Sequence, residues 1–171
     1  MNSIVLESRR LALRTFEAAD AADVFACITP AITRFMTWEP PPSQGAFADT
    51  WQSWLPAIAA QNDHYFVIRA RTNGQCLGIA ALHAMRTKHS ELGIWLRADD
   101  HGKGFGKEAV TAVVRWASKE LRPDYFEYPV AEQNLASRRI AISLGGSVRE
   151  HRSTPKYKSV VYHIPAIHPA G

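Results

Sequence analysis

The segment His101-Gly-Lys-Gly-Phe-Gly-Lys-Glu-Ala109 constrains the fold more than any other part of the sequence. Its three glycines and two lysines stand between a strand-like apolar run, residues 91–97, and an amphipathic helical pattern. A glycine loop that opens a helix leaves backbone N–H groups without partners, and the helix dipole and the lysines add positive charge there. The sequence therefore predicts a strand, a phosphate-binding loop and a helix in immediate succession.

The rest of the chain alternates between strand-like and helix-like segments. Alternating or β-rich runs predict strands at residues 11–15, 64–71, 75–83, 89–97, 125–130, 147–152 and 157–164. Apolar residues at helical spacing predict helices at about 20–28, 32–36, 44–60, 109–121 and 134–144, the first ended by Pro30 and the third kinked or broken at Pro56. We therefore expect one α/β domain over residues 1–171, with a mixed, mostly antiparallel six- to seven-stranded sheet flanked by helices.

Composition narrows the environment and the class of ligand. The net charge of +4 suits an anionic ligand, but the basic residues are spread along the chain, which does not favour a nucleic-acid face. No apolar run approaches the roughly 20 residues of a membrane span, and the first residues do not follow a signal-peptide pattern. Cys27 and Cys76 are far apart and the seven histidines lack metal-ligand spacing, so we expect reduced thiols, a cytoplasmic protein and no structural metal.

Two common phosphate-loop motifs do not fit the glycine loop. A P-loop would need glycine in place of His101 and serine or threonine in place of Glu108. A dinucleotide-binding G-x-G-x-x-G loop would need a third glycine at Lys107, and it would open a βαβ unit instead of following several strands. ATPases and NAD-dependent enzymes are therefore disfavoured.

The loop and its flanking motifs together resemble the acetyl-CoA-dependent GNAT N-acetyltransferases, and more narrowly their RimJ/RimL-type branch. The matching segments cover nearly the whole chain: Leu6–Arg14, Met36–Pro40, Gln75–Ile79, Gly93–Ala109 and Val130–Gly145. The resemblance implies a GNAT-like fold, acetyl-CoA as co-substrate without a metal, and a cytoplasmic enzyme that takes a small-molecule amine or a peptide N-terminus. It leaves a homodimer open.

The resemblance also assigns the residues that hold the acyl donor. In that family the loop reads Gln or Arg, two variable residues, Gly, one variable residue, then Gly or Ala, and its backbone amides wrap the CoA pyrophosphate. His101 departs from this pattern, and Lys103 and Lys107 can offset the lost charge. The implied cofactor-binding set is Ile94, Trp95, Leu96, His101, Gly102, Lys103, Gly104, Phe105, Gly106, Lys107 and Asn134. Its strand residues 94–96 would pair with the pantetheine arm and offer a backbone N–H to the oxyanion.

Acetyl transfer from a thioester also needs a hydrogen-bond donor for the leaving sulfur. The resemblance assigns that role to Ser137, in an Asn-x-x-Ser pattern that begins at Asn134. Asn134 also suits a helix N-cap, and a plain surface position is the alternative for Ser137. Many GNAT enzymes carry a tyrosine seven residues after the asparagine, but Ala141 stands there.

The base that accepts the proton of the amine stays open. Glu91 shares a strand face with Gly93 and Trp95, and an outward-facing glutamate without a role is an equal alternative. Glu39, in the loop stiffened by three prolines, is the second catalytic candidate, or it attracts a cationic amine to the cleft. His64 and His83 are weaker candidates, and the amine can also bind in its neutral form.

Three functional hypotheses follow from these residues. The first is acetyl transfer to the primary amine of a protein N-terminus, an amino acid or a small amine. The second is a non-catalytic acyl-CoA-binding module, and the third, an RNA- or ribosome-associated protein, rests only on the basic charge. We expect the acceptor between the N-terminal helices, the loop at residues 36–42 and the turn at 154–159, with Trp38 lining it and Trp51 and Trp54 mainly in the core.

Overall fold

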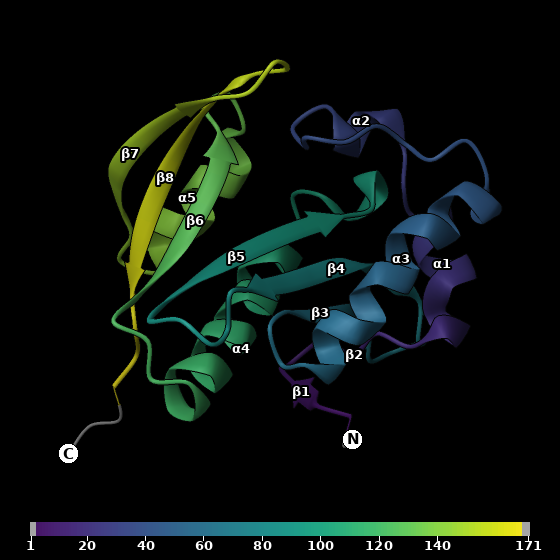
Figure 1. Ribbon diagram of the computed structural model, residues 1–171, viewed down its shortest axis with the longest axis horizontal. Coiled ribbons are helices and arrows are strands. Elements are labelled where there is room, and N and C mark those ends of the chain that lie inside the picture. Colours follow the sequence, from purple (N-terminus) through teal and green to yellow (C-terminus); the bar gives the residue numbers. More distant parts are fainter. Residues whose placement is uncertain (1–2, 169–171) are drawn as a thin grey trace.

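Eight strands form one continuous sheet in the order β1-β2-β3-β4-β5-β6-β8-β7 (Figure 1). The computed structural model describes residues 3–168. The strands are β1 (Val5–Glu7), β2 (Leu11–Thr15), β3 (His64–Ala70), β4 (Cys76–His83), β5 (His89–Leu96), β6 (Tyr125–Ala131), β7 (Ser147–Ser153) and β8 (Lys158–Pro165). Neighbours are antiparallel except β5 and β6, which run parallel. The predicted mixed, mostly antiparallel sheet is confirmed with one strand more than expected, because the three residues of β1 are too few to give a periodic pattern.

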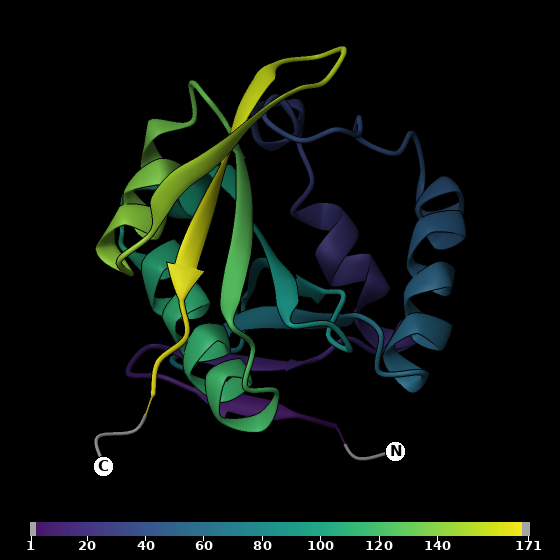
Figure 2. The ribbon, with the colours of Figure 1, turned by 60° about the vertical axis from the view of Figure 1, so that its left-hand side comes forward.

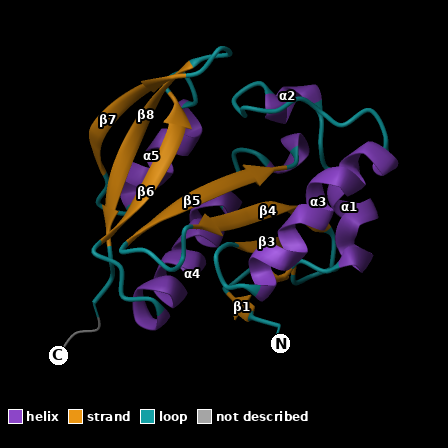
Figure 3. Cartoon of the chain, viewed as in Figure 1, coloured by secondary structure: helices purple, strands orange, loops and turns teal. Residues whose placement is uncertain are grey.

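Helices cover both faces of this sheet (Figures 2 and 3). They are α1 (Ala21–Ala26), α2 (Pro30–Thr33), α3 (Gln44–Ala59), α4 (Phe105–Glu120) and α5 (Leu135–Ser143), with the short 3-10 helices η1 (Ala18–Asp20) and η2 (Ala98–Asp100). Buried residues of α4 and α5 pack on one face of the sheet, and those of α1 and α3 pack on the other. Burial of apolar side chains on both faces stabilises the sheet as the frame on which the loops are placed.

Two predicted helices differ from the observed ones around their prolines. The helix expected at residues 32–36 is α2, which already starts at Pro30, because the fixed φ of proline suits the first helical position. The break or kink expected at Pro56 is not a break, since α3 continues through it as one helix. Proline removes only the hydrogen bond to the carbonyl of Gln52, and both residues are exposed, so water can reach that carbonyl.

The sheet divides in two where β5 meets β6. Their register covers only the first three residues of each strand, His89–Glu91 opposite Tyr125–Glu127. Beyond these residues the two strands diverge, as Figure 1 shows, and β5 stays paired with β4 while β6 stays paired with β8. The parallel pair needs a crossover connection, which consists of η2, the glycine loop and α4. The glycine loop therefore starts at the open end of the gap between the two strands.

Candidate active site

The gap between β5 and β6 exposes the edge of β5 as a row of backbone hydrogen-bonding groups. The Arg97 N–H donates to the Leu77 carbonyl of β4, so alternation turns the backbone groups of Trp95 toward β4 and those of Ile94 and Leu96 into the gap. His101 Nε2 lies 2.8 Å from the Leu96 carbonyl oxygen and donates to it, which supports this direction. Ile94 thus presents both a donor and an acceptor to an extended ligand that enters the gap.

The glycine loop ends in a helix N-terminus with free backbone donors. Gly102 and Gly104 adopt left-handed conformations, φ +76° and +80°, that favour glycine, and Gly104 is the N-cap of α4. Within residues 3–168, the N–H groups from Gly102 to Lys107 have no hydrogen-bond acceptor. Several unpaired N–H groups at a helix N-terminus are suited to a phosphate or pyrophosphate.

The basic side chains around the loop differ in whether they already have a hydrogen-bond or ion-pair partner. His101 is turned toward the Leu96 carbonyl, and Lys103 Nζ lies 3.3 Å from a carboxylate oxygen of Asp100. Lys107 makes no ion pair with any described residue. Lys107 is therefore better placed than Lys103 to offset the missing Gln or Arg, a role that the sequence assigned to both.

Contacts among Ser8, Arg10 and Glu108 fix the glycine loop in place, and we call them the Arg10–Glu108 clasp. The carboxylate of Glu108, in the first turn of α4, accepts hydrogen bonds of 2.7 Å from the Ser8 hydroxyl, the Arg10 backbone N–H and Arg10 Nε. Arg10 Nη1 donates to the Lys103 carbonyl at 2.8 Å, and its guanidinium lies 4.3 Å from the centre of the Phe105 ring. Burial alone would raise the pKa of Glu108, but the hydrogen bonds from Ser8 and Arg10 together lower it. The clasp ties the loop to the start of β2.

The loop opens on a cleft of about 750 Å³, which we call the donor cleft. It lies between α2, the end of β5, the glycine loop and the first turns of α5. All members of the predicted cofactor-binding set line it except Lys103: Ile94, Trp95, Leu96, His101, Gly102, Gly104, Phe105, Gly106, Lys107 and Asn134. Gly106 lies where α4 crosses α5, and a Cβ there would lie 2.9 Å from Ile140 Cδ1, so the end of the Ile140 side chain would have to shift.

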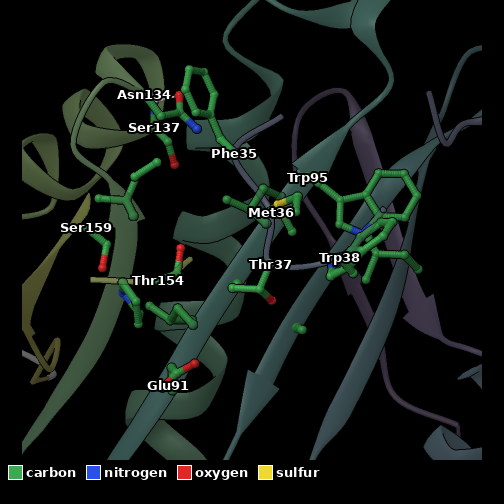
Figure 4. Close-up of a pocket in the computed structure, with 18 of the residues that line it drawn as sticks. Phe35, Met36, Thr37, Trp38, Glu91, Trp95, Asn134, Ser137, Thr154 and Ser159 are labelled. Atoms are coloured by element: carbon green, nitrogen blue, oxygen red, sulfur yellow. Dashed lines mark hydrogen bonds between the residues drawn. The ribbon is translucent and has the colours of Figure 1, made fainter. Parts of the chain in front are cut away.

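A second cleft of about 660 Å³, which we call the acceptor cleft, adjoins the donor cleft at the gap between β5 and β6 (Figure 4). Its walls come from the loop at residues 35–41, α3, strands β3 to β6 and the turn between β7 and β8. The two clefts meet at six shared lining residues: Phe35, Met36, Ile94, Trp95, Asn134 and Ser137. A ligand in the donor cleft and one in the acceptor cleft would therefore touch each other beside Ser137.

Asn134 and Ser137 lie at this junction, at the start of α5. Asn134 is the N-cap, and its side-chain oxygen accepts a hydrogen bond from the Ser137 backbone N–H at 3.2 Å. The Ser137 hydroxyl lies 2.6 Å from the hydroxyl of Tyr128, a residue of β6 that is 1% exposed. Burial raises the pKa of Tyr128 to about 12. The sequence prediction missed Tyr128: alternation along β6 indicates a buried residue there, but not the partner of its hydroxyl.

The carboxylates and histidines proposed as bases are in different surroundings. Glu91 lines the acceptor cleft, is half-buried, and forms no ion pair with a described residue. Glu39 also lines the cleft, but its side chain is 73% exposed and its carboxylate lies 2.6 Å from Lys156 Nζ. His83 lines the cleft and lies 3.4 Å from Asp63. Of the two carboxylates, only Glu91 is half-buried without an ion pair, which suits it to accept a proton.

His64 lies outside both clefts. Its ring is buried against Phe66 and Trp116, and Nε2 lies 2.8 Å from the Thr15 hydroxyl. Burial lowers the pKa of His64 to about 4. The histidine is therefore neutral at pH 7 and belongs to the packing of the sheet.

The tryptophans expected at the acceptor side divide between cleft and core. Trp38 lines the acceptor cleft, and so does Trp54, for which the sequence favoured a core position. The Trp54 ring stacks on Tyr65, with ring centroids 4.4 Å apart, and both rings line the cleft. Trp51 packs against Phe16 and does not line the cleft. The acceptor cleft therefore has a largely aromatic wall.

Two properties hold for the described residues, 3–168. None of the helices there is both long and apolar enough to span a bilayer. In the same residues, no three side chains of His, Cys, Asp or Glu gather as a metal site would require. Cys27 and Cys76 are buried free thiols.

Comparison with known proteins adds a family match and several fold matches. A family model described as "Acetyltransferase (GNAT) domain" matches residues 10–147. An acetyltransferase of Salmonella typhimurium that modifies the N-terminal serine of a ribosomal protein is 14% identical, with a TM-score of 0.82 over 96% of this chain and 100% of that one. Spermidine N-acetyltransferase of Vibrio cholerae is 16% identical, with a TM-score of 0.78 over 93% and 97%. A ribosomal-protein alanine acetyltransferase of Vibrio fischeri is 14% identical, with a TM-score of 0.78 over 95% and 97%.

Proposed function

Because this chain belongs to the GNAT family of acetyltransferases, we propose that it transfers the acetyl group of acetyl-CoA to the primary amine of a peptide N-terminus or a small monoamine. The observation that carries this proposal is the meeting of the donor and acceptor clefts at Ile94 and Ser137. An acyl donor bound along the glycine loop would bring its thioester to the point where the acceptor cleft begins.

The donor side is supported by the free backbone groups of the loop and of β5. The N–H groups from Gly102 to Lys107 would hold the pyrophosphate, and the edge of β5 at Ile94 would pair with the amides of pantetheine. Asn134 lines both clefts and would contact the same arm. These contacts use only backbone groups and one amide, so they do not depend on the residue at position 101.

The reaction would proceed by direct attack of the amine on the thioester. The nitrogen forms a bond to the carbonyl carbon, the carbon–sulfur bond breaks, and the electron pair leaves with sulfur. A backbone N–H of Ile94 or Leu96 would meet the oxyanion, and Ser137 would donate a hydrogen bond to the sulfur. Glu91 would accept the proton that the nitrogen loses, directly or through water, and the leaving thiolate would take up a proton from solvent.

The charges of the acceptor cleft favour a monoamine over a polyamine. Apart from its tyrosines, the ionisable side chains that line it are Glu39, His83, Glu91 and Arg152. Lys156 neutralises Glu39, so Glu91 is the one carboxylate of the described lining without an ion pair. A polyamine carries several positive charges and needs several free carboxylates, whereas a peptide N-terminus carries one charge beside an apolar chain that suits the aromatic wall.

A binding assay and an activity screen test this proposal. Calorimetry with CoA should give a dissociation constant in the micromolar range or below, and acetyl-CoA should release free thiol with short peptides and monoamines faster than with spermidine. Gly104→Trp should abolish binding, because the side chain would fill the loop and its Cβ would lie 3.3 Å from Arg10 Nη2. CoA binding without thiol release from any amine would refute catalysis and support an acyl-CoA-binding module, and absence of CoA binding would refute both.

A further inference from the structure

The hydroxyl of Ser137 does not have the partner that a helical serine usually takes. In Ser53, Thr111 and Ser143, which lie in α3, α4 and α5, the hydroxyl donates to a backbone carbonyl three or four residues earlier, at 2.6 to 2.7 Å. Ser137 makes no such bond among the described residues, and its one hydroxyl partner there is Tyr128. The hydrogen of Ser137 is therefore not used by its own helix.

The direction of the bond between Tyr128 and Ser137 follows from the surroundings of the two hydroxyls. Tyr128 is fully buried, and Ser137 Oγ is the one hydrogen-bond partner that its hydroxyl has within residues 3–168. A phenol is a stronger acid than an alcohol and is the better donor, so Tyr128 donates and Ser137 accepts. The hydrogen of Ser137 must then point away from Tyr128, and Ser137 lines both clefts at their junction.

We propose that Tyr128 is a positioning residue for the leaving group: it fixes Ser137 as an acceptor on one side, so that the Ser137 hydroxyl donates to the sulfur of the acyl donor on the other. This inference rests on the proposed acetyl transfer. As the carbon–sulfur bond breaks and sulfur gains the electron pair, Ser137 donates a stronger hydrogen bond, and Tyr128 in turn donates a stronger one to Ser137. Burial keeps the pKa of Tyr128 at about 12, so the phenol stays protonated and no proton leaves it.

Tyr162 offers a matched control for Tyr128. The two tyrosines are register partners on β6 and β8, and both are buried to within 2% exposure. Each hydroxyl binds a neighbouring residue of α5: Tyr128 binds Ser137, and Tyr162 accepts a hydrogen bond of 2.9 Å from Arg138 Nε. Tyr162 lines neither the donor cleft nor the acceptor cleft. Tyr162→Phe thus removes a similarly buried tyrosine hydroxyl and changes no residue that lines the two clefts.

A double-mutant cycle tests the proposal by kinetics. Tyr128→Phe and Ser137→Ala should each lower kcat about tenfold or more, with KM for acetyl-CoA nearly unchanged, and the double variant should be no slower than the slower single one. Tyr162→Phe should stay within about twofold of the unmodified protein. If Ser137→Ala is slow and Tyr128→Phe is not, or if the two effects multiply, the proposal is overturned while acetyl transfer stands.

A second readout does not need turnover. The thiol of bound CoA can be titrated by its thiolate absorbance, and we expect its pKa to rise in Tyr128→Phe and Ser137→Ala but not in Tyr162→Phe. Difluorotyrosine placed at position 128 is a stronger donor and should shift the thiol pKa downward, which tests the proposal even if Tyr128→Phe folds poorly. An unchanged thiol pKa in the fluorinated protein would overturn the role of Tyr128. If CoA does not bind at all, the proposed function itself fails, and this inference fails with it.

Discussion

Replacing Arg10 with methionine should weaken acetyl-CoA binding although Arg10 lies in the turn before β2, outside the donor cleft. The variant loses the bond from Nε to Glu108, the bond from Nη1 to the Lys103 carbonyl and the contact with the Phe105 ring. The Arg10 side chain is 41% exposed and that of Glu108 17%, so solvent screens the ion pair. We assign about 0.5 kcal/mol to each of the two bonds and about 0.5–1 kcal/mol to the cation–π contact, in total about 1.5–2 kcal/mol of folding free energy.

That loss should appear in two measurements. The melting temperature should fall by about 3–8 °C, given about 2–4 °C for each kcal/mol in a domain of this size. Because the Lys103 carbonyl is no longer fixed, the loop amides must be ordered by the ligand, and calorimetry should show a Kd for acetyl-CoA raised about tenfold, or about 1.4 kcal/mol.

Arg9 provides the control for charge. It is the neighbouring residue, it is exposed, and it makes no hydrogen bond or ion pair with residues 3–168. Arg9→Met removes the same charge and should change Kd by less than twofold. If Arg10→Met binds acetyl-CoA as tightly as the unmodified protein, or if Arg9→Met weakens binding equally, the clasp does not organise the loop.

Three further predictions concern the acceptor cleft and the core. Lys156→Met should raise KM for the amine several-fold without changing Kd for acetyl-CoA. The reason is that Lys156 Nζ joins the turn between β7 and β8 to the carbonyls of residues 33 and 38 and to the Glu39 carboxylate. Steady-state kinetics measures the effect with Lys158→Met as the control, and equal KM values in the two variants would contradict the prediction. Glu91→Gln should lower kcat about 10²-fold at pH 7 with Kd for acetyl-CoA unchanged, and near-normal kcat would exclude Glu91 as the base. Burial lowers the pKa of His64 from 6.5 to about 4, so the unfolded chain binds the proton first and folding stability is lost as pH falls from 6.5 to 4. Urea unfolding should show about 2 kcal/mol less stability at pH 5 than at pH 7. A His64→Phe variant that keeps the whole difference would refute His64 as its origin.

Local sequence patterns predicted most of the secondary structure of the protein. The alternation of apolar residues placed seven of the eight strands, and Gly145, which adopts φ +82°, ends α5 where the glycine pair predicted it. The loop at residues 101–107 also lies where the sequence placed it, because a glycine run before an amphipathic helix is a local feature. The three-residue β1 escaped prediction, since its identity depends on its pairing with β2 and not on a pattern of its own.

Side-chain partners far apart in the sequence could not be predicted in this way. Glu39 was a candidate base on its position in the loop, but its pairing with Lys156 across 117 residues depends on how the turn between β7 and β8 folds over the cleft. Trp54 has the spacing of a core residue, and its place in the cleft depends on Tyr65 of β3, on which it stacks. Periodicity gives the face on which a side chain lies, whereas its charge state and exposure depend on the neighbouring element.

The clasp shows how a local motif and a distant one form a single feature. Leu6–Arg14 resembled only the first strand of the family, and the glycine loop resembled only its phosphate site. In the folded protein, Arg10 and Ser8 bind Glu108, the residue that replaces the serine or threonine of a P-loop. A P-loop uses that position to bind a metal ion, whereas here the carboxylate binds the turn between β1 and β2. The position that excluded a P-loop is therefore the one that joins the glycine loop to the segment before β2.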